Sequence, residues 1–157
     1  MVVDWTGHGL LLVVALPAAV AFALAFSGVV LSLLGLRTLP EVVWRAVGWA
    51  AALLDFALAC LVLGRGFDPE QLGMQLVESF VWSDRLGAHL SLGVDGISLF
   101  FLISTAGLVP LAMAASRLEM QGSVRSWIFA CLLLESSLLG ALAATNLLAF
   151  AFFWALG

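Results

Sequence analysis

One apolar run, Leu10 to Leu36, constrains this chain most, because it contains no charged residue. A helix needs about 20 apolar residues to cross a bilayer core, so this run can span a membrane with room to tilt. A signal peptide would begin with a basic segment, whereas Met1 to Asp4 holds an acid and no base. The run therefore predicts a first membrane-spanning helix.

The composition extends this prediction to the whole chain. Hydrophobic residues make up 64% of the sequence and charged residues only 10%, whereas about 25% of residues are charged in soluble domains. The basic residues are all arginines, scattered singly, so they form no phosphate-binding patch and nucleic acid is not an expected partner. We expect a polytopic membrane protein in contact with the lipid bilayer.

The hydropathy pattern predicts an all-α fold: a membrane helix bundle of about four complete transmembrane helices and a truncated fifth. We expect a single membrane domain over residues 1–157, with spans at 10–36, 42–64, 96–116 and 127–144 and a partial span at 147–157. A helix over this last segment rises only about 16 Å, roughly half the hydrocarbon thickness. We therefore expect the natural protein to continue, or a partner to cover this end.

Residues 65–95 separate the second and third expected spans and are more polar. We expect an extracytoplasmic loop lying on the membrane surface, in which Pro69 opens a short helix. The apolar stripe of that helix would consist of Met74, Val77, Phe80 and Val81.

The arginines are distributed unevenly between the two ends of the expected spans. One side carries Arg37, Arg45, Arg117 and Arg125. The other side carries Arg65 and Arg85, together with most of the acids. Because basic connections stay in the cytoplasm, we expect an extracytoplasmic N-terminus in a multi-pass protein of the cell inner (cytoplasmic) membrane.

Two acids lie inside expected spans, and both are candidates for a proton pathway. Glu135 follows three leucines near the middle of the fourth span, where an acid costs about 2.5–3.5 kcal/mol on insertion. It would carry protons, or hydrogen-bond Ser136, Ser137 or a neighbouring helix. Asp55 lies in the second span with no arginine near it on that helix, so any partner must come from another span. It would relay protons or act as a neutral hydrogen-bond donor.

The other polar residues favour structural roles. Asp95 stands three residues before Ser98 at the start of an apolar run, a spacing typical of a helix cap. Cys60 and Cys131 fall inside apolar runs without metal-ligand spacing, and we expect small buried side chains. The sequence shows no catalytic triad, nucleotide loop or haem motif, so we expect no catalytic residue, cofactor or metal in this chain.

The residues from His89 to Leu99 read HLSLGVDGISL and lead into an apolar run ending at Pro110. This segment resembles the M-type antiporter-like subunit of NADH–quinone oxidoreductase, respiratory complex I, and "GVDGIS" is fairly specific for it. An upstream Trp82 also agrees. Downstream agreement with the family's fourth and fifth helices lies at Leu132 to Glu135, Gly140, Asn146 to Phe150 and Phe152 to Trp154. The chain is thus similar to the N-terminal part of that subunit.

The resemblance implies a membrane-arm subunit that contributes to proton translocation coupled to NADH:quinone electron transfer within a larger assembly. Its partners would be the other membrane-arm subunits, and partner subunits would handle NADH and quinone. The family's channel glutamate follows the Phe-Trp pair of the fifth helix, where this chain has Ala155, and the family's later lysines have no counterpart here. Alternatives are a subunit of a related Na⁺/H⁺ antiporter or membrane-bound hydrogenase, or a truncated scaffold paralogue that does not pump.

Overall fold

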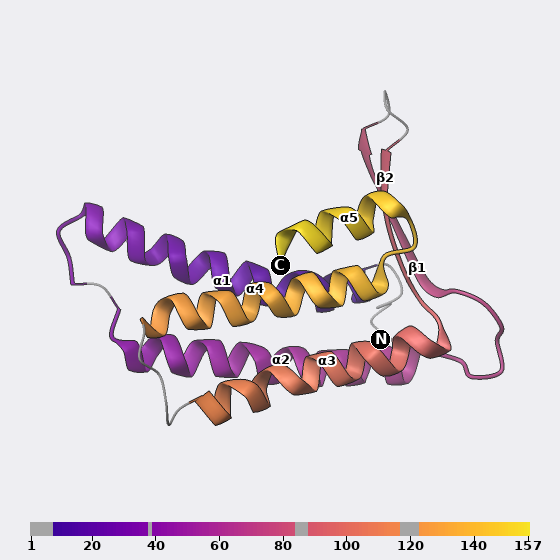
Figure 1. The fold of residues 1–157 in the computed structure, drawn as a ribbon, viewed down its shortest axis with the longest axis horizontal. Coiled ribbons are helices and arrows are strands. Elements are labelled where there is room, and N and C mark those ends of the chain that lie inside the picture. The colour runs from indigo at the N-terminus through magenta and orange to yellow at the C-terminus, as the bar shows by residue number, and fades with distance from the viewer. Residues whose placement is uncertain (1–7, 38, 84–87, 117–122) are drawn as a thin grey trace, which may run out of the picture.

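The computed structural model describes residues 8–37, 39–83, 88–116 and 123–157. The elements follow in the order α1 (Gly9–Leu33), α2 (Glu41–Gly66), β1 (Gln75–Ser83), β2 (Ala88–Val94), α3 (Gly96–Ala115), α4 (Val124–Ala143) and α5 (Leu147–Leu156). Figure 1 shows α1 to α4 lying along the long axis of the molecule, with the two strands at one end and α5 folded back over α4.

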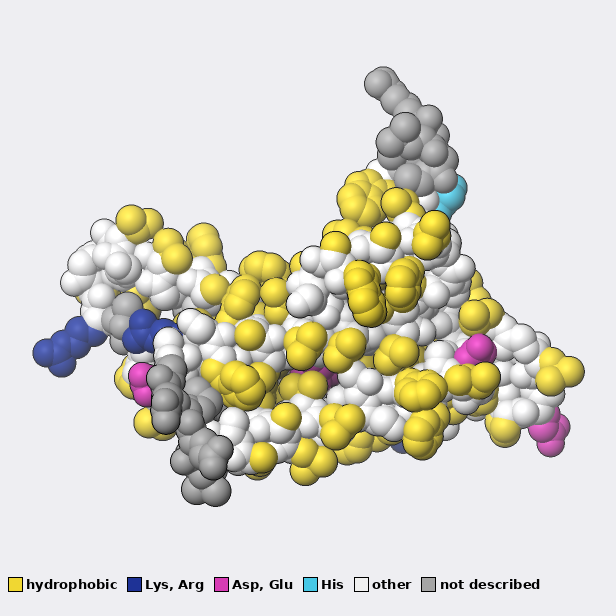
Figure 2. Space-filling view, viewed as in Figure 1, with side chains coloured by type: hydrophobic (Ala, Val, Ile, Leu, Met, Phe, Trp, Pro, Cys, Tyr) yellow, Lys and Arg dark blue, Asp and Glu magenta, His cyan; other side chains and the backbone are white. Residues whose placement is uncertain are grey.

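Four of the helices, α1 to α4, are long and apolar enough to cross a membrane. They confirm the predicted helix bundle. Helix α4 is its centre, because it packs against each of the other four helices. Figure 2 shows hydrophobic side chains spread over the outside of the helices, and basic side chains at the end where α1 and α2 join. An apolar exterior of this kind suits a lipid environment.

The buried side chains of the bundle divide into two apolar clusters along its length. The hairpin-end cluster includes Leu10, Val14, Ala59, Leu63, Leu102, Ala106, Leu139 and Ala143. The arginine-end cluster includes Ala21, Leu24, Trp44, Ala52, Met113, Val124, Ile128 and Leu132. Every long helix contributes to both clusters, so each helix passes through a boundary layer between them.

The prediction of a short helix after Pro69 is wrong. Residues 75–83 form β1, which pairs antiparallel with β2 and places Glu78 opposite Leu92 and Phe80 opposite Leu90. The apolar spacing fitted a helix, but these β-branched and aromatic residues are also typical of a strand. The segment forms a strand rather than a helix because β2 supplies apolar cross-strand partners, of which Leu92 is fully buried.

The hairpin attaches to two parts of the bundle. At one of them, Glu78 reaches the first turn of α1, where its two carboxylate oxygens accept hydrogen bonds from the backbone N–H groups of Leu10 (2.8 Å) and Leu11 (3.0 Å). At the other, Ser91 accepts a backbone hydrogen bond from Thr145 (2.9 Å), in the turn between α4 and α5. The strands therefore hold together helices from opposite ends of the sequence.

Candidate proton site between α2 and α4

Asp55 and Glu135 are both completely buried, each with 0% of its surface exposed. Asp55 lies on α2 and Glu135 on α4, two helices in direct contact. Each acid is near the middle of its helix. The two residues that the sequence marks as proton-pathway candidates are therefore both enclosed within the bundle.

The register of the two helices places these acids at the same depth. Helices α2 and α4 run in the same direction, since Arg125 near the start of α4 donates a hydrogen bond (3.2 Å) to Leu39, just before α2. Further along, a Cβ at Gly48 would collide with the Ile128 side chain. Seven residues beyond that contact, or about two helical turns, come Asp55 and Glu135. Both acids thus stay on the faces that the two helices turn toward each other.

The acids lie in the layer between the two apolar clusters. Along α2 this layer falls between Ala52 and Ala59, and along α4 between Leu132 and Leu139. The same layer holds Pro17 of α1 and Pro110 of α3. A helical proline provides no N–H for the carbonyl four residues before it, so the carbonyls of Val13 and Ala106, in the hairpin-end cluster, lose their helical donor. The two acids and the two prolines therefore interrupt the apolar packing between the clusters.

None of the four carboxyl oxygens of Asp55 and Glu135 has a hydrogen-bond partner among the described residues. The adjacent serines bond elsewhere, since Ser136 donates to the Val14 carbonyl (2.6 Å) and Ser137 to the Leu134 carbonyl (2.9 Å). The interpretation that these serines satisfy Glu135 is therefore wrong for the structure as described.

Positive charge is also distant from the two acids. Helices α1, α3 and α5 contain no titratable side chain, and the chain has no lysine. The nearest arginines on the same helices are Arg45 and Arg65 for Asp55 and Arg125 for Glu135, and each stands ten residues from the acid, a rise of about 15 Å. Two ionised carboxylates in such surroundings would be strongly unfavourable, since burial and like charge both oppose the second ionisation.

Asp95 and Ser98 lie apart from these acids, at the start of α3. One Asp95 carboxylate oxygen accepts hydrogen bonds from the backbone N–H groups of Ser98 (2.6 Å) and Ile97 (3.1 Å), while the Ser98 hydroxyl accepts one from the Asp95 N–H (2.9 Å). The Ser98 backbone N–H, the larger influence, holds the pKa of Asp95 below its ordinary value. The arrangement is a capping box, and it begins the helix.

The cysteines and histidines do not gather into a site. Cys131 is half-buried but Cys60 is exposed, so the expectation of two buried cysteines is wrong for Cys60. Within the described part of the chain, no group of histidine, cysteine and acidic residues has the arrangement of a metal site. His8 and His89 are both exposed, near the hairpin. These positions offer no chemistry comparable with that of the buried acids.

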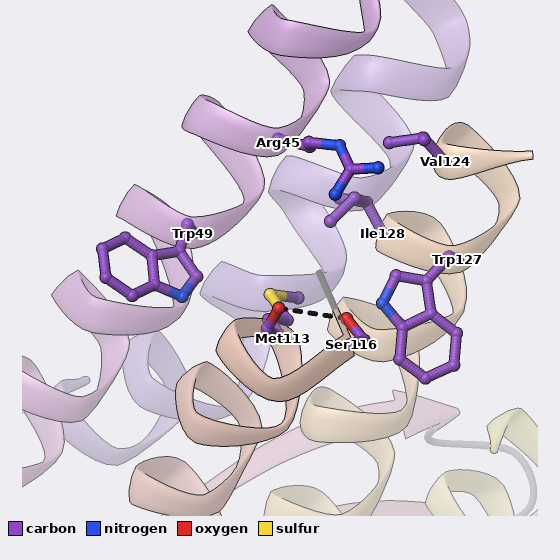
Figure 3. A pocket seen from close by; sticks show the side chains of 7 residues that line it. All are labelled: Arg45, Trp49, Met113, Ser116, Val124, Trp127 and Ile128. Atoms are coloured by element: carbon purple, nitrogen blue, oxygen red, sulfur yellow. Dashed lines mark hydrogen bonds between the residues drawn. The ribbon is translucent and has the colours of Figure 1, made fainter. Parts of the chain in front are cut away.

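A small cavity opens at the arginine end, between α2, α3 and α4 (Figure 3). Its walls include Arg45, Trp49 and Trp127, and the Ser116 hydroxyl in it donates to the Met113 carbonyl (3.0 Å). The cavity measures about 10 Å³, room for about one water molecule. Arginine and tryptophan together are typical of a membrane–water interface, and we assign this end of the bundle to one.

Sequence reasoning found both acids but missed their pairing. A signal for it exists in the chain, because Arg45 precedes Asp55 by the same ten residues that separate Arg125 from Glu135. If both arginines mark one membrane surface, the acids must lie at one depth. Glu78 was missed as well, since nothing local to it indicates that its partners lie in α1.

Relatives of this chain are described as subunit M or chain 4 of NADH- or NAD(P)H-quinone oxidoreductases and of NADH-ubiquinone oxidoreductase. NADH-quinone oxidoreductase subunit M of Rhodobacter capsulatus is 38% identical over 111 residues, which is 71% of this chain and 21% of that protein. NAD(P)H-quinone oxidoreductase chain 4 3 of Picosynechococcus is 35% identical over 127 residues, which is 79% of this chain and 23% of that protein. NADH-ubiquinone oxidoreductase chain 4 of Triticum aestivum is 35% identical over 104 residues, which is 66% of this chain and 21% of that protein.

No family model matches the chain. The chain spans about a fifth of the length of these curated relatives. Its matched part nevertheless covers most of its own residues, and its helices are those of a multi-pass membrane protein. The chain therefore belongs, over that part of their length, to the family of subunit M and chain 4 of the NADH–quinone oxidoreductases.

Proposed function

We propose that this chain contributes to proton translocation coupled to NADH:quinone electron transfer, as part of a complex I membrane arm. Its partners are the other membrane-arm subunits, which together with the remaining subunits handle NADH and quinone. The observation that carries the proposal is the buried pair Asp55 and Glu135 at the middle of the bundle, whose carboxyl oxygens have no hydrogen-bond partner in the described part of the chain. Acids at such a depth are costly and are typical of proton pathways.

Ala155 favours a second candidate, a scaffold paralogue that does not pump. The resemblance to M-type subunits places a glutamate at this position, directly after Phe153 and Trp154. Ala155 is exposed near the end of α5 and has no titratable group. On this alternative, α1 to α4 hold a place in the assembly, and the buried acids carry no protons.

Replacing the buried acids by their amides separates the two candidates. We expect Glu135→Gln and Asp55→Asn each to lower the number of protons moved per NADH oxidised by about tenfold or more, because an amide neither takes up nor releases a proton at neutral pH. The measurement is proton uptake by vesicles that contain the assembled complex. Glu41→Gln, which changes an exposed acid at the start of α2, is the matched control.

Assembly must be followed in the same membranes, by the amount of complex that carries the chain. If the complex assembles normally and proton uptake is unchanged in both Glu135→Gln and Asp55→Asn, the scaffold candidate is established. Normal assembly with reduced uptake in both variants, and unchanged uptake in Glu41→Gln, supports the proton role.

The proposed orientation puts the hairpin outside the cell and the arginine end in the cytoplasm. It is supported by Arg45 and Arg125, which lie at one end of the bundle, and by Asp68 and Glu70, which follow α2 at the other. Arg85 and Arg117, which also enter the expectation, lie outside the described residues.

Cysteine labelling in intact cells tests this orientation. In a chain with Cys60 and Cys131 changed to serine, we expect Gln71→Cys to react with a membrane-impermeant maleimide and Ser123→Cys to react only after the cells are opened. Both positions are exposed, at opposite ends of the bundle. The reverse pattern would invert the proposed topology.

A further inference from the structure

We infer that Asp55 and Glu135 act as one two-carboxyl site that holds a single shared proton between α2 and α4. The inference deepens the proposed function and rests on it for its role in translocation. Its structural basis is separate: the common depth of the two acids, the faces they occupy, and the lack of any other partner for their oxygens among the described residues.

The charge state follows from the surroundings of the pair. Every element packed against α2 and α4 must be considered, and α1, α3 and α5 contribute no titratable group. On the hairpin, Glu78 is bound to the start of α1 and His89 is exposed. On the two helices themselves, Cys131 stands one turn before Glu135, while the other charged residues and Cys60 lie further along.

No cation in this set reaches the layer of the acids. Two negative charges there would repel each other in a medium of low dielectric constant, and each would also lose its hydration. One proton removes one charge and supplies one donor. The protonated carboxyl then donates to the carboxylate, directly or through one water, in a strong charge-assisted hydrogen bond. That arrangement satisfies oxygens that otherwise remain unpaired.

The pair also provides a proton-transfer step between helices. The step is Glu135–COOH plus Asp55–COO⁻ giving Glu135–COO⁻ plus Asp55–COOH, in which one O–H bond breaks, one forms, and the total charge is unchanged. The step moves the proton from α4 to α2, two helices in direct contact.

A comparison of single and double variants tests the coupling in the assembled complex. We expect Asp55→Asn, Glu135→Gln and the double variant to reduce proton translocation by the same factor, because the loss of either acid removes the whole site. Two acids that work independently would give a double variant whose factor is the product of the single ones, and that result overturns the inference. The exchanged pair Asp55→Glu with Glu135→Asp keeps two carboxyls and is expected to recover at least half of the wild-type translocation.

Infrared difference spectroscopy supplies a readout that does not depend on pumping. Carboxylic acid and carboxylate groups absorb at different frequencies, so their titration is followed directly in complexes held in lipid. We expect two separated steps for the wild-type pair and one step in each single variant, at a pH that differs from both wild-type steps by about one unit or more. If each remaining acid titrates as it does in the wild type, the shared proton is excluded.

The two readouts keep this inference distinct from the proposed function. Coupled titration with unchanged translocation would uphold the shared proton and overturn the transport role. If translocation falls, the effects of the two single variants multiply in the double variant and the two acids titrate independently, the transport role is upheld and the shared proton is overturned. Loss of both bands in the double variant assigns them to these residues, and bands that persist there would refute the assignment.

Discussion

Replacing Glu78 with alanine is expected to separate the hairpin from α1 and to destabilise the whole bundle. The buried Glu78 carboxylate accepts hydrogen bonds from Leu10 and Leu11, and α1 has no side-chain cap of its own at His8. Each buried N–H group left unpaired costs about 1–3 kcal/mol. The negative charge near the positive end of α1 contributes roughly 0.3–1 kcal/mol more. The Glu78→Ala chain should therefore unfold at a clearly lower concentration of a denaturing detergent than the wild-type chain does.

The measurement is unfolding of the purified full chain in mixed micelles, followed by circular dichroism. Hydrogen exchange at the amides of Leu10 and Leu11 should become faster in the same variant. Glu78→Gln keeps an acceptor without the charge and should show an intermediate loss. Glu70→Ala removes an exposed acid from the same connection and is the control. Equal stability of Glu78→Ala and Glu70→Ala would show that the contact to α1 is not needed.

Replacing Gly140 with alanine is expected to push α5 away from α4. A Cβ at Gly140 would enter the space of the Phe153 ring, including the ring atom nearest the backbone, so the ring cannot simply swing aside. Phe153 is largely buried in the hairpin-end cluster. Overpacking of this kind costs about 1–3 kcal/mol, and here it acts on a short helix of ten residues.

A second substitution provides the decisive comparison. Gly140→Ala combined with Phe153→Ala removes the collision and should recover part of the stability lost in Gly140→Ala. Gly64→Ala is the control, because a Cβ at this glycine of α2 meets no other atom within 4 Å. If the double variant is less stable than either single variant, the close approach of α5 to α4 is not the cause of the loss.

Composition and hydropathy were sufficient to predict the class of fold. Charged residues are only 10% of the chain, and apolar stretches recur at lengths that match a bilayer, so a bundle of membrane helices follows from the sequence. Asp95 and Ser98 were recognised as a helix cap for a similar reason, since the interaction joins residues three positions apart. Properties that depend on neighbouring residues can be read along a chain.

The hairpin was misread because its stability is not local. Met74, Val77 and Val81 have the spacing of a helical stripe, yet all three are exposed in the structure. The strand forms because Leu90 and Leu92 of β2 pair with it. Cross-strand pairing and burial decide between the two structures, and neither is visible in a short window of sequence.

The sequence by itself determined that this protein is a bundle of apolar helices with two acids at membrane depth, because length, hydropathy and charge are properties of single segments. Only the tertiary structure decided that Asp55 faces Glu135, since the meeting depends on the direction and register of α2 and α4. It also decided that Glu78 binds the start of α1. The Glu78 contacts join residues 67 and 68 positions apart, and the two acids lie 80 positions apart, so packing across the bundle selects both arrangements.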